Sequence, residues 1–94
     1  MRSDTVIERL NALRDEAYAE FSARLIPSVA RERISEFYGK IQMFLYDPSP
    51  IVRETALYAL NELHIKIQET DAGYLLNDTD RFLGRYAATV LKNV

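Results

Sequence analysis

The segment from Asp47 to Leu63 is the part of this 94-residue chain that most constrains its fold. Asp47 and Ser49 lie in a proline-containing turn and can accept hydrogen bonds from free backbone N–H groups, and Pro50 suits the first turn of a helix. The small and aliphatic residues behind this turn recur at helical spacing: Val52, Ala56, Ala59, Leu60 and Leu63. One helix cannot bury such a stripe alone, so we expect flanking helices to cover it.

The same pattern returns at an offset of 31 residues, which places Asp78 on Asp47. The apolar residues Phe82, Leu83, Ala87, Val90, Leu91 and Val94 then fall on Ile51, Val52, Ala56, Ala59, Leu60 and Leu63. The second copy is imperfect, because Gly84 stands where the first has Arg53. A fixed period of about 20 to 50 residues is typical of stacked-repeat proteins.

The segment Leu45–Leu63 resembles the HEAT-like repeat family through the pattern L-x-D-x-x-x-x-V-R-x-x-A-x-x-A-L-x-x-L. The resemblance extends over about residues 35–94. In that family each repeat is a helical hairpin, and the residues at the positions of Asp47 and Arg53 help to tie adjacent repeats together. The resemblance implies an all-α fold, a short α-solenoid of about three stacked hairpins, with residues 1–94 as a single domain.

Hydrophobic spacing and helix-breaking residues predict six helices. Their expected ranges are about 3–13, 15–26, 28–45, 47–63 with an extension towards 68, 72–76, and 78 or 80 to 92. The second helix should begin at an Asp15 cap, face Tyr18, Phe21 and Leu25 inward, and stop at Pro27. No run of alternating β-branched residues is present, so we expect almost no strand.

The composition is that of an ordinary globular domain, with 48% hydrophobic and 28% charged residues. Twelve basic against 14 acidic residues give a net charge of −2, which does not favour general nucleic-acid binding. The absence of cysteine excludes disulfides and thiolate chemistry. The sequence has no leader-like segment and no apolar run of about 18 residues, so we expect a cytoplasmic protein without a membrane partner.

Residues suited to catalysis or to metal binding are scarce. His64 is the only imidazole, so one chain cannot assemble a His pair or a Ser-His-Asp triad. The Asp78–Asp80 segment lacks the glycine and the distant Glu of an EF-hand, and we interpret it as a helix cap. The three glycines are isolated and form no phosphate loop. We therefore expect no enzyme activity, no metal and no cofactor.

The residues around Pro27 include three arginines, Arg24, Arg31 and Arg33. Arginine offers a planar fork of donors to phosphate or to carboxylate, so this corner could contact nucleic acid or an acidic partner. Glutamates are interspersed among the arginines, which favours local ion pairs instead.

Residues 6–34 resemble the N-terminal opening of the bacterial DNA alkylation repair family, which is itself built of HEAT-like repeats. The matching stretches are Val6–Leu10, Asp15–Tyr18, Phe21–Val29 and Arg31–Ile34. The match ends at Ser35, and the base-holding residues of that family lie in repeats beyond it, so none is carried over. This resemblance implies the alternative function, a truncated relative that contacts nucleic acid through the arginine corner.

Exposed aromatic residues favour a protein partner instead. Tyr46, Tyr58 and Tyr86 fall off the apolar stripes, and we regard Tyr58, Phe82 and Tyr86 as candidate interface residues. The C-terminal helix ends on apolar residues, which predicts a homodimer anchored by Phe82 or Tyr86 unless Val94 folds back against the fourth helix. The leading expectation is a non-catalytic helical-repeat interaction module or scaffold whose partner is a protein.

Overall fold

The computed structural model describes the backbone of residues 2–22 and 27–92 and the side chains of residues 4–19 and 31–91. Its helices are α1 (Arg2–Ser22), α2 (Pro27–Gln42), the 3₁₀ helix η1 (Met43–Tyr46), α3 (Pro50–Glu62), α4 (Glu69–Leu76) and α5 (Arg81–Lys92). No strand occurs in this part of the chain, so the prediction of an all-α fold is confirmed. None of the described helices is both long and apolar enough to cross a membrane.

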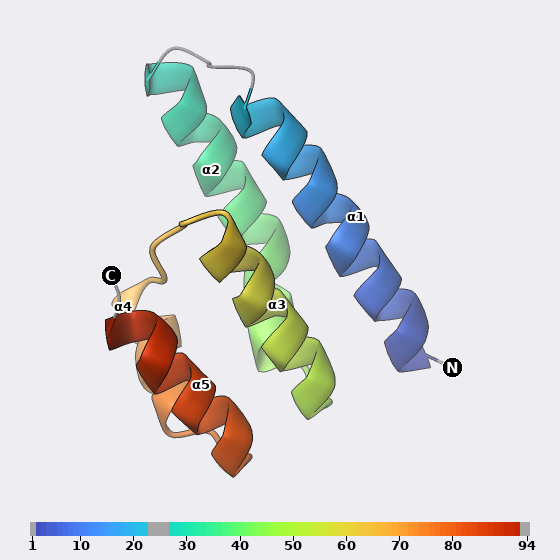
Figure 1. Cartoon of the computed structure of the whole chain (residues 1–94), viewed down its shortest axis with the longest axis vertical. Coiled ribbons are helices and arrows are strands. Elements are labelled where there is room, and N and C mark those ends of the chain that lie inside the picture. The colour runs from blue at the N-terminus through green and yellow to red at the C-terminus, as the bar shows by residue number, and fades with distance from the viewer. Residues whose placement is uncertain (1, 23–26, 93–94) are drawn as a thin grey trace.

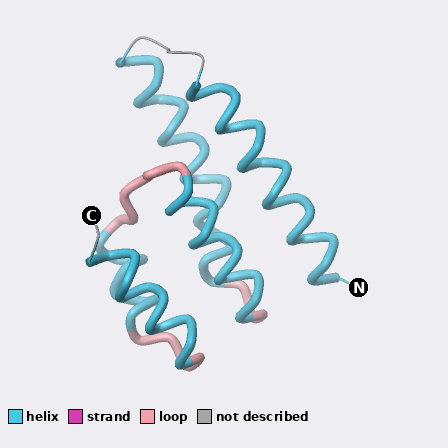
Figure 2. The backbone as a smooth tube through the Cα atoms, viewed as in Figure 1, coloured by secondary structure: helices cyan, strands magenta, loops and turns pink. Residues whose placement is uncertain are grey.

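The helices form two layers. Figure 1 shows α1, α3 and α5 side by side and running in the same direction, with α2 and α4 behind them. The turn before α3 and the turn before α5 both lie at the lower end of the molecule in Figure 2, and the 63–68 connection lies at the upper end of α3. This arrangement places the two sequence copies next to each other in the same orientation.

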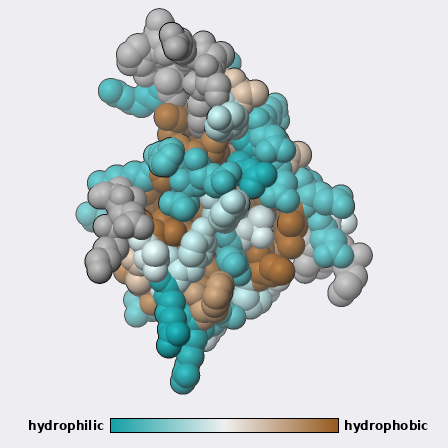
Figure 3. Space-filling view, in the orientation of Figure 1, coloured by the Kyte–Doolittle hydropathy of each residue, from teal (hydrophilic) through white to brown (hydrophobic). Residues whose placement is uncertain are grey.

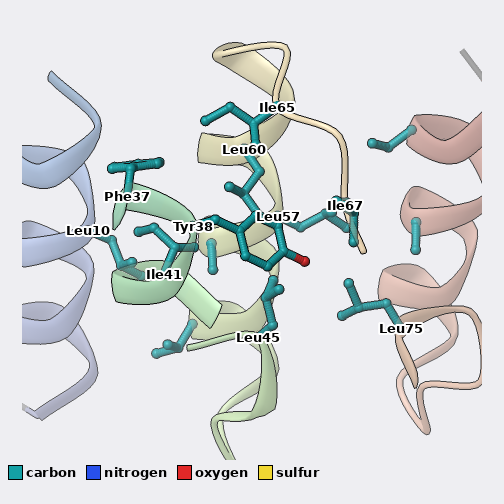
Figure 4. Close-up of a cluster of buried hydrophobic side chains, with 14 of the residues drawn as sticks. Leu10, Phe37, Tyr38, Ile41, Leu45, Leu57, Leu60, Ile65, Ile67 and Leu75 are labelled. Carbon is teal, nitrogen blue, oxygen red and sulfur yellow. The ribbon is translucent and has the colours of Figure 1, made fainter. Parts of the chain in front are cut away.

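The core is centred on α3, which contributes Val52, Ala56, Leu57, Ala59 and Leu60. Leu10 of α1 and Ile41 of α2 pack into the same cluster and are fully buried (Figure 4). The extended 65–68 segment adds Ile65 and Ile67, and Leu75 joins from α4. Burial of this apolar surface is the main force that holds the two layers together.

Residues of α3 and α5 that are 31 positions apart have the same burial. Val52 and Leu83, Ala56 and Ala87, and Ala59 and Val90 are buried pairs at this offset. Ile51 and Phe82 also correspond, and both are exposed. The two copies therefore present the same face to the interior, although Ile51 and Phe82 lie outside the buried stripe that their apolar character suggested.

The predicted break between the first two helices is wrong, because α1 is one continuous helix from Arg2 to Ser22. Asp15 lies in its middle, where its carboxylate pairs with Arg14 at 3.3 Å instead of capping a helix. Tyr18 is 65% exposed, not inward. The predicted inward positions of Phe21 and Leu25 lie outside the described side chains. The partly exposed ion pair with Arg14 gives the Asp15 carboxylate a partner without ending the helix. The presence of an aspartate alone was therefore not sufficient to predict a helix start at residue 15.

The ends of the later helices also differ from the prediction. The third helix becomes 3₁₀ at Met43, α3 begins at Pro50 and ends at Glu62, and α4 begins at Glu69 instead of at about residue 72. Pro50 occupies the first helical turn as expected. Asp80 caps α5, since its carboxylate accepts the Leu83 N–H at 3.0 Å.

A backbone reversal at His64 ends α3. His64 has φ 56°, in the left-handed region that glycine normally occupies. The His64 N–H donates to the Asn61 carbonyl at 3.1 Å, and the Ile65 N–H donates to the Leu60 carbonyl at 3.0 Å. These two bonds form a Schellman motif, and the apolar residues Leu60 and Ile65 that it joins are both buried. The motif turns the chain out of α3 and into the extended segment, so the fourth helix cannot continue towards residue 68.

Replacing His64 tests this reversal. We expect His64→Gly to be more stable than His64→Ala by about 1 kcal/mol, because an L side chain is penalised in the left-handed region and glycine is not. Urea denaturation followed by circular dichroism measures the difference. Equal stabilities of the two variants would show that residue 64 does not adopt this conformation in solution.

Candidate interaction surfaces

Arg53 connects the two sequence copies. Its Nε and Nη2 atoms each donate to a carboxylate oxygen of Asp78 at 2.9 Å, and its Nη1 donates to the carbonyls of Asp47 at 2.7 Å and Pro48 at 3.1 Å. Both charged side chains are almost completely buried. Asp78 occupies in the second copy the place of Asp47 in the first. Arg53 therefore ties the start of α3 to the turn before α5 through charge-assisted, two-pronged hydrogen bonds.

The two turns that flank Arg53 have the same internal hydrogen bonds. The Asp47 carboxylate accepts the Ser49 N–H at 2.9 Å, and the Asp78 carboxylate accepts the Asp80 N–H at 2.9 Å. The backbone bonds repeat as well: Asp47 N–H to Phe44 carbonyl and Asp78 N–H to Leu75 carbonyl, then Arg53 N–H to Ser49 carbonyl and Gly84 N–H to Asp80 carbonyl. Each aspartate thus shapes its own turn by bonding two residues ahead, and Asp78 additionally binds the arginine of the preceding copy.

Arg53→Ala should lower the free energy of unfolding by about 3–5 kcal/mol, because it leaves the Asp78 carboxylate buried without its cation. A matched control is Arg33→Ala, whose carboxylate partner Glu36 lies at 3.4 Å in an exposed pair. The control should cost no more than about 1 kcal/mol. Urea titration at neutral pH measures both values, and similar losses would contradict the role assigned to Arg53.

A second polar contact joins the two members of the rear layer. The carboxylate of Asp71, in the first turn of α4, is buried and accepts hydrogen bonds from Tyr38 at 2.6 Å, from Gln42 at 3.0 Å and from the hydroxyl of Tyr46. The Gln68 N–H donates to the Tyr38 hydroxyl at 3.0 Å. Figure 4 shows this hydroxyl pointing to the side of the cluster where Ile67 and Leu75 lie. No cation among the described residues pairs with Asp71, so three neutral donors and the helix start stabilise its negative charge.

These bonds change the titration of both tyrosines. The hydrogen bond to Asp71, together with burial, raises the pKa of Tyr46 to about 12. Burial is the main cause that raises the pKa of Tyr38, and its bond to Asp71 adds to the effect. Both hydroxyls therefore remain protonated, and able to donate to Asp71, across the neutral range.

Alkaline pH should open this contact. An unfolded tyrosine has a pKa of about 10, so the stabilisation from Tyr38 and Tyr46 is complete below about pH 10. It is lost as the pH rises through the folded-state pKa, which is about 12 for Tyr46. Urea denaturation between about pH 8 and pH 11.5 should show stability falling in the upper part of this range, with a shallower fall in Tyr46→Phe. A wild-type stability that stays constant while tyrosinate absorbance rises would contradict this.

The surface beside Asp71 exposes two aromatic rings. Tyr46 of η1 and Tyr74 of α4 are 40% and 43% exposed, and their ring centroids lie 4.3 Å apart with the planes tilted by 40°. A groove adjoins Tyr74 and is lined by Arg53, Gly73, Tyr74, Asn77, Asp78 and Thr79. We refer to the two rings and this groove as the α4 surface. The predicted exposure of Tyr46 is confirmed.

A second groove lies between α1 and α3. It is lined by Ile7, Asn11, Arg14, Ile51, Glu54, Thr55 and Tyr58. Figure 3 shows hydrophobic surface between these two helices, which is one of several hydrophobic patches on this face. The Tyr58 hydroxyl donates to Glu62 at 2.9 Å, which is the main cause that raises its pKa, and the Arg14 guanidinium lies 5.9 Å from the centre of its ring. Tyr58 is exposed, as predicted, but its ring already has a cation from its own chain.

The other two predicted interface residues, Phe82 and Tyr86 of α5, differ in exposure. Phe82 is 65% exposed, whereas Tyr86 is half-buried. The Tyr86 hydroxyl is buried, and this burial raises its pKa although the side chain of Asn61 acts in the opposite direction. The prediction that Tyr86 is exposed is therefore wrong. Val90 lies in the core and Leu91 packs against it, so these two residues are not the uncovered apolar surface that the sequence suggested. Val94 lies outside the described residues.

The predicted arginine corner is only partly described. Arg31 and Arg33 are exposed on α2, and Arg33 pairs with Glu36. They lie two residues apart on a helix, so their side chains do not point to the same side. Arg24 lies outside the described residues. The described part of the corner therefore gives no concentrated basic face.

Reactive groups are not gathered in the described part of the chain. His64 is exposed at the end of α3, and the described residues contain no group of three His, Cys, Asp or Glu side chains placed to hold a metal ion. The buried carboxylates of Asp71 and Asp78 are occupied by tyrosine, glutamine and arginine donors. Their geometry serves to join helices.

Sequence reasoning missed Asp71 and Tyr74 as members of a site. Asp71 precedes the fifth helix as predicted, at about 72–76, and was assigned no role. The available signal was the spacing of Tyr38, Gln42 and Tyr46, three donors four residues apart, which a helix aligns on one face.

We compared the chain with models of protein families, with curated protein sequences and with solved structures, and none of them matches it. The resemblance to HEAT-like repeats therefore rests on the sequence pattern of residues 45–63.

Proposed function

We propose that this chain is a non-catalytic helical-repeat interaction module, a short HEAT-like α-solenoid that binds a protein partner. The observation that carries the proposal is the contact between Arg53 and Asp78, because it joins equivalent turns of two sequence copies. Proteins built of stacked repeats have extended surfaces that they use for binding.

The exposed aromatic residues support a protein partner. Tyr46, Tyr58, Tyr74 and Phe82 are all at least 40% exposed, and tyrosine and phenylalanine are enriched where proteins meet. The described charges support a nucleic-acid partner less well than a protein partner. Arg33 forms an ion pair with Glu36, and Arg53 forms a buried ion pair with Asp78. Phosphate binding needs a concentrated basic surface.

Affinity capture with the purified chain tests this function. The bait is exposed to a nuclease-treated extract, in parallel with a doubly substituted bait, Tyr58→Ser with Tyr74→Ser, whose helical content is checked first by circular dichroism. We expect specific proteins that remain bound at about 0.5 M salt and are lost from the substituted bait.

Binding of DNA or RNA that falls steeply with salt and depends on Arg31 and Arg33 would overturn the proposal in favour of a nucleic-acid contact. Retention of the same proteins by both baits would also contradict it, because the exposed aromatic residues would then play no part.

A further inference from the structure

The α4 surface lies on an acidic stretch of the chain. The stretch from Glu69 to Asp80 contains four carboxylates and no Lys, Arg or His. One of these carboxylates, Asp78, is neutralised by Arg53, and Asp71 is not paired with any described cation. The buried charge of Asp71 lies directly behind Tyr46, whose hydroxyl donates to it. A cationic ligand is the electrostatic complement of such a surface.

The two tyrosine rings add a specific preference to this charge. The face of an aromatic ring is its negative side, and it attracts a guanidinium or an ammonium group placed over it. Tyr46 and Tyr74 form a tilted pair with substantial exposure, and the described structure places no cation over either ring. Tyr58 differs, because Arg14 of the same chain lies over its ring. Within the described residues, the chain itself therefore leaves the two rings of the α4 surface without a cation.

The backbone beside Tyr74 leaves room for a ligand chain. Gly73 is exposed within α4, and a Cβ added to it would meet nothing within 4 Å. Its φ is not positive, so neither backbone conformation nor internal packing calls for glycine there. Glycine is disfavoured inside a helix. At this position, next to Tyr74, it leaves no side chain on the helix surface that lines the groove.

Arg53 also lines this groove but does not repel a cation as a free arginine would. Its guanidinium makes four hydrogen bonds, two to the carboxylate of Asp78 and two to backbone carbonyls. Its charge is thus compensated by Asp78, while the charges of Glu69, Asp71 and Asp80 remain uncompensated by any described ion pair.

We infer that the α4 surface binds a basic peptide segment of the protein partner, with an arginine side chain stacked on Tyr74 and Tyr46. This inference rests on the proposed function and adds the chemical class of the partner. Arginine fits better than lysine, because its planar guanidinium stacks on aromatic rings and is less strongly hydrated. The peptide backbone lies along the groove beside Gly73.

The test uses the full chain and a fluorescent peptide of alternating glycine and arginine, with binding measured by anisotropy at about 0.1 M salt. Two further peptides replace arginine by lysine or by citrulline, which keeps the shape and removes the charge. We expect the arginine peptide to bind most tightly, the lysine peptide more weakly, and the citrulline peptide not detectably.

Variants of the chain locate the site. Tyr74→Leu removes the ring but leaves the contact between Tyr46 and Asp71 intact, and we expect it to weaken arginine-peptide binding by about two- to fivefold. Tyr18→Leu, at a tyrosine of α1 that is 65% exposed and has no place in the proposed site, is the matched control on the other layer and should change binding by less. Circular dichroism and urea titration establish that both variants are folded.

Equal affinity of wild type and Tyr74→Leu, or equal binding of the arginine and citrulline peptides, would overturn the inference. The peptide measurements can fail while affinity capture still retrieves proteins through the exposed aromatic residues. In that case the protein partner does not place a basic segment on the α4 surface, and the proposed function stands. If affinity capture also fails, the proposed function falls with it.

Discussion

The guanidinium of Arg53 is the contact on which the two halves of this fold depend. It is buried, and the side-chain hydrogen bonds that it makes within the described residues all end in the two turns that precede α3 and α5. A buried arginine is tolerable only where its donors are matched in number and direction, so the carboxylate of Asp78 and the carbonyls of Asp47 and Pro48 must all be in place. The position of α5 relative to α3 is consequently fixed by polar geometry, and apolar packing then fills the space between them.

The rear layer is joined by a different kind of contact. Asp71 carries a negative charge into the junction between α2 and α4, where only neutral donors from Tyr38, Gln42 and Tyr46 receive it. An ion pair thus joins the helices of the front layer, α3 and α5. In the rear layer, α2 and α4 are joined by a carboxylate that accepts hydrogen bonds from hydroxyl and amide groups. Because the rear contact keeps a net charge, it shapes the electric field of the surface above it, which the Arg53 contact does not.

The sequence was sufficient for the fold class and for the stripe of α3, because helical spacing of apolar residues is a local signal. It was also sufficient for the equivalence of Asp47 and Asp78. Helix ends were less predictable: Asp15 resembles a cap but lies within α1, and His64 occupies a backbone conformation usually assigned to glycine. The spacing of Tyr38, Gln42 and Tyr46 is a sequence signal for a shared face, but Asp71 could not be predicted as the residue that they contact. It lies 25 to 33 positions away, and its proximity depends on the packing of whole helices.

Gly84 makes the two sequence copies unequal, because only the first copy has an arginine that binds the next turn. In the first copy Arg53 reaches forward to the aspartate of the next turn, whereas Gly84 at the equivalent position has no side chain to offer. A Cβ at Gly84 would meet the Leu76 carbonyl at 3.6 Å, an ordinary van der Waals distance, so the site does not sterically demand glycine. An engineered array that continued this unit beyond α5 would therefore need an arginine restored at position 84 and an aspartate supplied in the added turn. Without both, the added unit would have to rely on apolar packing alone to set its angle.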